Sequence, residues 1–203
     1  MKRAALIALS LGVAASASAA TLKMPAAPEI ALEVSEGEMP HPLSAGLLLP
    51  DEVRSAVHVV KTSPFDRIKY PIGEYTVDVF SRNLPQVFAS VTEVDTDKAA
   101  DVDLVVEIAI VRFEAVIPHP ASNPYTATAV YKITVRDPDG ETILVQTVTG
   151  DGQTSKGMMS GFKARGLAAE SAARAMDDAA RQALEALAEA PELAEIPESK
   201  NAN

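Results

Sequence analysis

Residues 101–149 read DVDLVVEIAIVRFEAVIPHPASNPYTATAVYKITVRDPDGETILVQTVT, and this stretch decides the fold. It predicts three long antiparallel strands, the last two joined by a tight turn at 137–140. In the turn, Pro138 fixes its own φ and Gly140 tolerates a positive φ. The second strand alternates strictly, which is typical of an antiparallel sheet that buries one face. Its apolar positions are Tyr125, Ala127, Ala129, Tyr131, Ile133 and Val135.

The first of these strands changes its apolar face part-way along. Apolar residues occupy the even positions up to Ile110, and the odd positions from Val111 to Ile117. A β-bulge near Ile110 would restore a single buried face, because one extra residue reverses the alternation. The alternative is a strand that continues beyond the core at one end.

Residues 1–20 have the pattern of a secretory signal peptide. Lys2 and Arg3 are followed by a short apolar run and then by small residues that end at Ala20. We therefore expect cleavage after Ala20 and a periplasmic location. The apolar run is too short to span a bilayer, so an uncut anchor is the weaker alternative and no transmembrane helix is expected in the mature chain.

Composition excludes several classes of function. The chain has no cysteine, which excludes disulfides, thiol catalysis, thiolate metal sites and lipid attachment through an N-terminal cysteine. It has no tryptophan, few aromatic residues and a net charge of −10, so no nucleic-acid partner is expected.

The rest of the chain predicts one α+β domain, a two-layer sandwich. We expect a mainly antiparallel sheet of about four to five strands with two helices on one face, in the order β-β-α-β-β-β-α. The predicted parts are a flexible lead at 21–28, the domain at 29–190 and a disordered tail at 191–203. Within the domain we expect strands at 29–34 and 53–61, an irregular loop at 36–51, and helices at 73–94 and 165–190.

The two helices differ in how well their patterns support them. The helix at 73–94 contains Pro85, so it either kinks there or consists of two shorter helices, with Pro85 in the first turn of the second. The helix at 165–190 has a buried stripe rich in alanine, which favours close packing on a sheet. That stripe consists of Ala169, Ala173, Met176, Ala180, Leu184 and Leu187.

Four patterns between Gly73 and Leu187 resemble small envelope lipoproteins of Gram-negative bacteria. They are GEYTVDVFSRNLPQVFASV, the strand entry ADVDLVVEI, the D-x-D-G hairpin and an Ala-rich helix ending in QALEAL. The similar proteins are the lipopolysaccharide-assembly lipoprotein, the auxiliary lipoproteins of ABC transporters and YajG-type lipoproteins. The resemblance implies a non-enzymatic protein that binds a larger envelope partner. The family's lipidated cysteine is absent here, so its membrane attachment does not carry over.

Three groups of residues are candidates for chemistry, and each has a simpler interpretation. Ser160 and Lys163 fit the S-x-x-K motif of penicillin-binding proteins, but the companion motifs would lie on the wrong side of the serine. Glu93 and Asp95, Asp97, Asp101 and Asp103 offer oxygen ligands for Ca²⁺, but they lack EF-hand spacing and fit a solvated loop. His41, His58 and His119 are scattered, and His58 is interpreted as structural. We expect no catalytic residue, metal ligand or cofactor.

The glycine-rich segment 150–161 lacks both phosphate-binding motifs and is expected to be a mobile loop. Near its end, Met158, Met159 and Phe162 form a candidate docking patch, because methionine side chains adapt to different partners. The sequence thus predicts a non-enzymatic periplasmic accessory protein that contacts an envelope protein or transporter component. The alternatives are a module that binds a small molecule or lipid in the space between the sheet and the helices, and a serine hydrolase built on Ser160 and Lys163.

Overall fold

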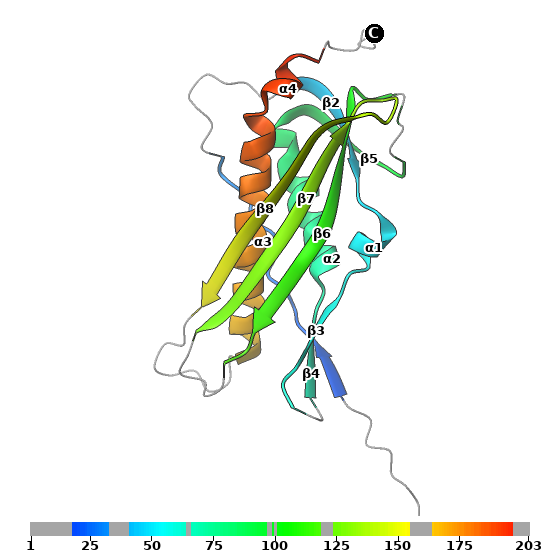
Figure 1. The fold of residues 1–203 in the computed structure, drawn as a ribbon. Coiled ribbons are helices and arrows are strands. Elements are labelled where there is room, and N and C mark those ends of the chain that lie inside the picture. Colours follow the sequence, from blue (N-terminus) through cyan, green and yellow to red (C-terminus); the bar gives the residue numbers. More distant parts are fainter. Residues whose placement is uncertain are drawn as a thin grey trace, which may run out of the picture.

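The predicted α+β class is confirmed. The computed structural model describes residues 18–32, 41–63, 66–96, 99, 101–118, 124–154 and 164–196. These residues form a five-stranded sheet, a three-stranded sheet and helices that lie against the larger sheet (Figure 1).

The main sheet has the strand order β5-β2-β6-β7-β8. The last three strands are antiparallel neighbours, as predicted, whereas β2 runs parallel to both β5 and β6. The bounds are β2 (His41–Leu48), β5 (Phe88–Val94), β6 (Leu104–Val116), β7 (Tyr125–Arg136) and β8 (Thr142–Thr154).

Three details of the predicted hairpin region are confirmed. All six apolar positions of β7, from Tyr125 to Val135, are buried. The turn closes with a hydrogen bond from Gly140 N to Asp137 O (3.0 Å), and Gly140 has a φ of 89°. The pairing of β6 with β7 shifts register between Ile110 and Arg112, so the bulge is present and Val111 is the extra residue.

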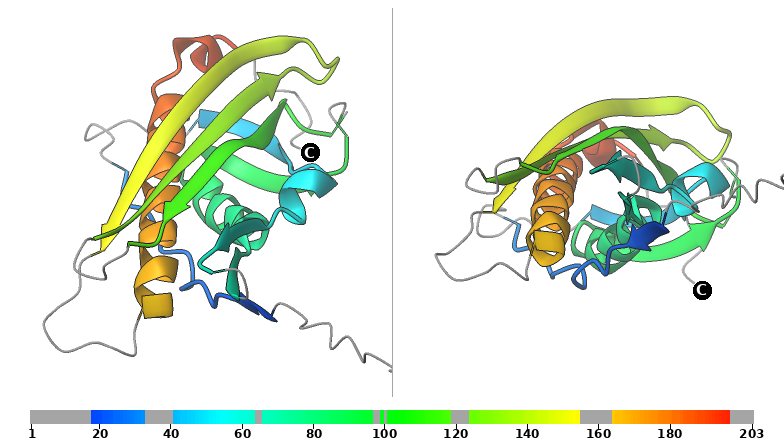
Figure 2. Two further views of the ribbon diagram at one scale, coloured as in Figure 1. Left: turned by 60° about the horizontal axis from the view of Figure 1, so that its bottom comes forward. Right: turned by 90° about the horizontal axis from the view of Figure 1, so that it is seen from below.

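Two long helices cover the concave face of the main sheet, α2 (Ile72–Asn83) and α3 (Ala164–Ala188), as Figure 2 shows. The predicted alanine-rich stripe of α3 is buried from Ala169 to Leu187. On its outer side, Arg174 pairs with Glu170 and Arg181 pairs with Glu185, both one helical turn apart. The helix therefore has the amphipathic character that its sequence predicts.

The close contact between α3 and β8 depends on two glycines. Gly150 and Gly152 belong to β8, so this part of the glycine-rich segment is strand and the expectation of a loop from 150 was wrong there. A Cβ added at Gly150 would collide with the backbone of Ala175 and Ala179, and one at Gly152 with the backbone of Ser171. Glycine is needed here because the helix backbone lies directly on the strand.

The smaller sheet has the order β1-β4-β3 and lies at one end of the molecule (Figure 1). Its strands are β1 (Ser18–Thr21), β3 (His58–Lys61) and β4 (Asp66–Tyr70). Aromatic side chains join it to the main sheet: the ring of Phe113 on β6 lies 5.1 Å from that of His58 and 5.7 Å from that of Tyr70. The predicted strand at 53–61 is correct only in its second half, because α1 (Asp51–Arg54) precedes it.

The predicted helix at 73–94 is too long. Helix α2 ends at Asn83, and the 3-10 turn η1 (Leu84–Gln86) follows with Pro85 at its start. The chain then becomes strand β5, the edge of the main sheet. Phe88, Val91 and Val94 continue the three-residue spacing of a helix although they lie in a strand, so the proline was the better guide to the boundary.

The expectations for the N-terminal part of the domain need two corrections. The segment 36–51 was expected to be a loop, but 41–48 form β2, with Leu43, Ala45 and Leu47 buried. Pro42 is tolerated because it lies at the start of the strand, where the pairing with β5 is irregular. The predicted strand at 29–34 is not seen in its described part, 29–32, which has no regular secondary structure and buries Ile30.

Both ends of the described chain pack on the domain. The segment expected to be a flexible lead, 21–28, contributes Leu22 and Ala27 to the hydrophobic core. The segment expected to be a disordered tail begins with the short helix α4 (Pro191–Ala194), in which Leu193 is 1% exposed. The domain boundaries and the cleavage after Ala20 stay predictions.

Candidate functional site

Several residues singled out from the sequence lie outside the described part of the chain. These are the proposed docking patch (Met158, Met159 and Phe162), the S-x-x-K pair (Ser160 and Lys163) and His119. The structure therefore leaves the docking patch and the serine-hydrolase interpretation as predictions.

The acidic segment before β6 has a structural role in the part that is described. Asp103 Oδ2 accepts hydrogen bonds from Ser44 N and Ser44 Oγ (both 2.7 Å), which ties β2 to the start of β6. Glu93 pairs with Arg54 at 3.0 Å, and Asp97 lies outside the described residues. Within the described ranges, no group of three or more His, Asp and Glu side chains is placed to hold a metal ion.

The two described histidines are far apart and each packs locally. His41 Nε2 lies 3.0 Å from Leu187 O, at the C-terminal end of α3. His58 packs between Tyr70 and Phe113, and its burial lowers its pKa even though Glu114 acts in the opposite direction. The structural interpretation of His58 agrees with this environment.

The helices and the sheet meet at a group of polar side chains that the sequence did not reveal. Tyr75 on α2 donates a hydrogen bond to Asp177 Oδ1 on α3 (2.8 Å), which joins the two helices. Thr76 Oγ1 donates its proton to Ile72 O (2.8 Å). The hydroxyl of Tyr131 on β7 lies 3.0 Å from the same oxygen, so Tyr131 is the donor and Thr76 the acceptor of that hydrogen bond. Tyr75 and Asp177 are 102 positions apart, so no local pattern could predict the pair.

Burial controls the protonation of this group. Burial, and the nearby Asp177 carboxylate, raise the pKa of Tyr75 far above its ordinary value of 10. Burial also raises the pKa of Tyr131, so both phenols remain protonated and act as hydrogen-bond donors. Burial raises the pKa of Asp177 to about 6, and the hydrogen bond from Tyr75 only partly opposes this. Asp177 therefore titrates near neutral pH while it holds α2 to α3.

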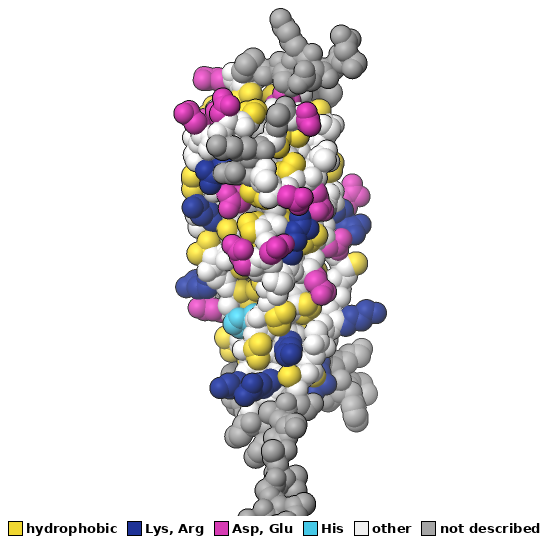
Figure 3. Space-filling view, turned by 90° about the vertical axis from the view of Figure 1, so that its right-hand side faces the viewer, with side chains coloured by type: hydrophobic (Ala, Val, Ile, Leu, Met, Phe, Trp, Pro, Cys, Tyr) yellow, Lys and Arg dark blue, Asp and Glu magenta, His cyan; other side chains and the backbone are white. Residues whose placement is uncertain are grey.

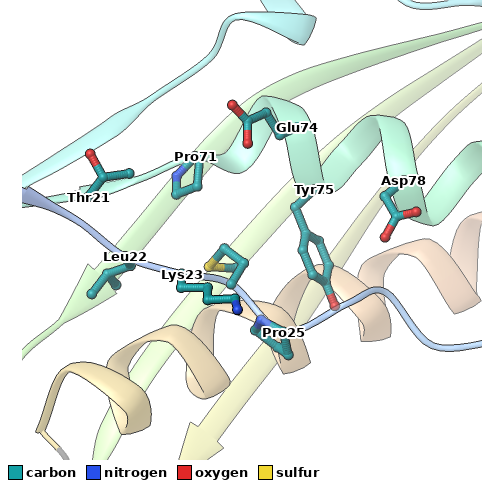
Figure 4. Close-up of a pocket in the computed structure, with 9 residues that line it drawn as sticks. Thr21, Leu22, Lys23, Pro25, Pro71, Glu74, Tyr75 and Asp78 are labelled. Atoms are coloured by element: carbon teal, nitrogen blue, oxygen red, sulfur yellow. The ribbon is translucent and has the colours of Figure 1, made fainter.

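A pocket of about 340 Å³ opens beside Tyr75, between α2 and the N-terminal segment (Figure 4). Thr21, Leu22, Lys23, Met24 and Pro25 form one wall. Pro71, Glu74, Tyr75 and Asp78 form the other. The pocket combines one cation with two carboxylates, so it suits a small polar molecule better than a lipid chain.

Two polar residues of α2 bond the chain just after the wall that the N-terminal segment forms. Asp78 Oδ2 accepts a hydrogen bond from Ala27 N (3.0 Å). Asn83, which is 0% exposed, accepts one from Ile30 N (2.8 Å) and donates one to Pro28 O (3.1 Å). These contacts hold residues 27–30 across the helix, directly after the wall formed by residues 21–25.

The layer between the main sheet and the helices is filled by side chains in the described structure. Phe80 of α2 and Tyr131 of β7 make an edge-to-face contact with ring centres 5.2 Å apart. Tyr131, Phe80, Met176 and Leu184 are at most 1% exposed. The lipid-binding alternative placed its ligand in this layer, and the packing gives it no support there.

Four exposed valines lie on or next to two strands that contact each other, β3 and β6, and we call this set the valine surface. Val59 lies on β3 and Val57 just before it, while Val111 and Val116 lie on β6. Their exposed fractions are 50% for Val57, 44% for Val59, 58% for Val111 and 59% for Val116. Figure 3 views this side and shows hydrophobic side chains at the surface in its lower half. The β-bulge at Val111, which the sequence predicts, was the signal that could have revealed this surface.

Comparison with known proteins gives only distant similarity in fold. No family model matches the chain, and no curated protein matches it. A Xanthomonas campestris protein of the DUF330 family is 14% identical, with 85% of this chain and 93% of that chain covered and a TM-score of 0.49. A minor lipoprotein of Acinetobacter baumannii is 12% identical, with 74% of this chain and 92% of that chain covered and a TM-score of 0.43. In the part of the chain that the structure describes, no helix is long and apolar enough to cross a membrane.

Proposed function

We propose that this protein is a non-enzymatic accessory protein of the Gram-negative cell envelope that acts by binding another envelope protein. The valine surface carries the proposal. Its four exposed valines lie on two strands that adjoin through the contact of His58 with Phe113. Large apolar side chains that gather on a surface are typical of protein–protein contact sites.

The polar residues of the helix layer support the same proposal. Tyr75, Asp177, Thr76, Tyr131 and Asn83 are engaged with one another or with the backbone. Their hydrogen bonds hold the domain together, and a rigid scaffold of this kind suits the display of a contact surface. The location in the periplasm rests on the signal-peptide pattern of residues 1–20, with cleavage after Ala20.

Crosslinking in cells tests the proposal. The tagged protein is crosslinked in the periplasm and purified together with whatever it contacts. We expect one envelope protein in near-equal amount, and its loss from the double variant Val59→Ser with Val111→Ser. Thr92→Ala, an exposed substitution on β5, serves as the control and should keep the partner. A wild-type protein that reproducibly captures nothing would contradict the proposal.

The pocket beside Tyr75 favours a second candidate, a module that binds a small polar molecule. Its volume of about 340 Å³ lies at the lower end of the range for small-molecule sites. Native mass spectrometry of the protein purified from periplasm checks this directly. A bound molecule that disappears in Glu74→Gln would support it, whereas a bare chain mass would count against it.

A further inference from the structure

Strand β8 is the last strand of the main sheet, so one of its edges has no neighbouring strand in the described part of the chain. Helix α3 protects the C-terminal half of that edge, where its side chains bond three outward-facing backbone groups. Gln182 Nε2 donates to Thr149 O (2.9 Å), Arg174 Nη1 donates to Gln153 O (3.0 Å), and Asp178 Oδ2 accepts from Asp151 N (3.3 Å). These bonds occupy positions that another strand would need.

The N-terminal half of the same edge is open. Backbone groups along a strand face its two neighbours alternately, so Val145 and Thr147 direct their N–H and C=O groups to the same side as Thr149. Among the described residues, no hydrogen bond reaches these four groups from that side. The segment 142–148 reads TILVQTV, without charge or proline, and the Val145 side chain is 49% exposed. It therefore lacks the charges and prolines that normally prevent strand addition, and its β-bulge at Ile143 lies at the N-terminal end of the segment, before Val145.

The charges at the two ends of this edge are acidic, whereas the nearest basic side chains, Lys132 opposite Thr147 and Arg136 bonded to Thr142, lie one strand further in on β7. Asp139 and Glu141 are not buried and lie in the turn that leads into β8, and Asp151 lies at the other end of the open part. If two copies of β8 paired with each other, with the pairing centred on Val145 or Gln146, this acidic turn would lie close to Asp151 of the second copy. Like charges therefore oppose self-pairing, whereas lysine or arginine at the ends of a foreign strand would be attracted.

We propose that the open half of β8 accepts an extended segment of a partner protein as a sixth strand. The added segment has β-branched residues at its centre and basic residues at its ends, and it bonds to the backbone of Val145 and Thr147. This edge lies on the opposite side of the β6–β7–β8 ribbon from the edge that adjoins the valine surface. The two proposals therefore rest on different residues and can fail separately.

The test uses the mature protein with two synthetic peptides, KTVTVTK and ETVTVTE. Hydrogen exchange measured by NMR should show slower exchange of the Val145 and Thr147 amides when KTVTVTK is added. Fluorescence anisotropy at low salt should show that KTVTVTK binds about fivefold more tightly than ETVTVTE, a ratio typical of a few exposed ion pairs.

Two proline variants distinguish the open half of the edge from the protected half. Thr147→Pro removes an outward N–H, which the fold does not use, and should abolish peptide binding. Gln153→Pro removes an outward N–H under α3 and should leave binding unchanged; melting curves of both variants verify folding. If neither peptide protects the Val145 and Thr147 amides, the proposal is wrong. If these amides are protected without peptide in a concentration-dependent dimer, the occupant is a second copy, which also overturns the proposal.

Discussion

Replacement of Gly150 by alanine should destabilise the protein through the contact between α3 and β8. The added Cβ would lie within 3 Å of Ala175 O and of Ala179 N and Cα, whereas ordinary contact begins at 3.4 Å. All three atoms belong to the helix backbone, so no side chain can rotate away to make room. Strand and helix must therefore separate by roughly 1 Å, enough to lose a quarter to a half of each dispersion contact at the interface.

The size of the effect follows from two opposing contributions. Overpacking of a well-packed interior costs about 1–3 kcal/mol, and contact with backbone on this side places Gly150→Ala near the upper end. The lower entropy of the unfolded alanine chain offsets about 0.4–1 kcal/mol. We expect the free energy of unfolding to fall by about 2 kcal/mol, which lowers Tm by about 4–8 °C in a domain of this size.

Urea unfolding followed by far-UV circular dichroism measures this difference. Gly166→Ala is the matched control, because nothing lies within 4 Å of a Cβ added there. Gly166 lies in the first turn of α3, so this variant should gain about 0.5 kcal/mol from the higher helix propensity of alanine. If Gly150→Ala unfolds within about 0.5 kcal/mol of the wild type with the same m-value, the backbone contact is not as close as described.

Three further substitutions test the polar contacts and the turn. Because the pKa of Asp177 is raised to about 6, its neutral form stabilises the fold below about pH 4, and that contribution is lost as pH rises through 6. Asp177→Asn keeps a hydrogen-bond acceptor for Tyr75. It should make the protein about 1 kcal/mol more stable than wild type at pH 7 but not at pH 4. Equal differences in stability at both pH values would refute the raised pKa of Asp177. Asn83→Ala should lower the free energy of unfolding, measured by thermal unfolding, by about 3 kcal/mol, because it leaves Ile30 N and other buried backbone groups unpaired. A loss below about 1 kcal/mol would show that water replaces the side-chain amide. Gly140→Ala, at φ 89°, should cost about 1 kcal/mol, and no loss would mean that the turn changes type.

The sequence predicts this fold well where one periodicity runs without interruption. The alternation from Tyr125 to Val135 and the stripe from Ala169 to Leu187 each identify an element, its buried face and its approximate bounds. Even the bulge after Ile110 is visible, because an inserted residue moves the apolar side chains to the other face. Local pattern is sufficient there because burial against the core selects the same residues that the periodicity marks.

Prediction fails where distant contacts decide the structure. Strand β2 contains Pro42 and Gly46, both poor strand residues, and it forms because β5 and β6 pair with it on its two sides. Phe88–Val94 continues an apparent helical pattern but becomes an edge strand for the same reason. The hydrogen bond between Tyr75 and Asp177 depends on where α3 crosses the sheet. The same crossing decides how much of the β8 edge lies beyond the reach of Gln182. No local pattern specifies this crossing.

Strand β1 lies where the signal peptide is predicted to end, so maturation would change the small sheet. Cleavage after Ala20 removes Ser18, Ala19 and Ala20, which pair with Asp66, Arg67 and Ile68 on β4. The mature protein would then keep β3 and β4 as a two-stranded hairpin, which is marginally stable on its own. Its retention would then depend on its contacts with the rest of the domain: Ile68 and Tyr70 of β4 are buried in the core, and the Phe113 ring of β6 packs against His58 and Tyr70.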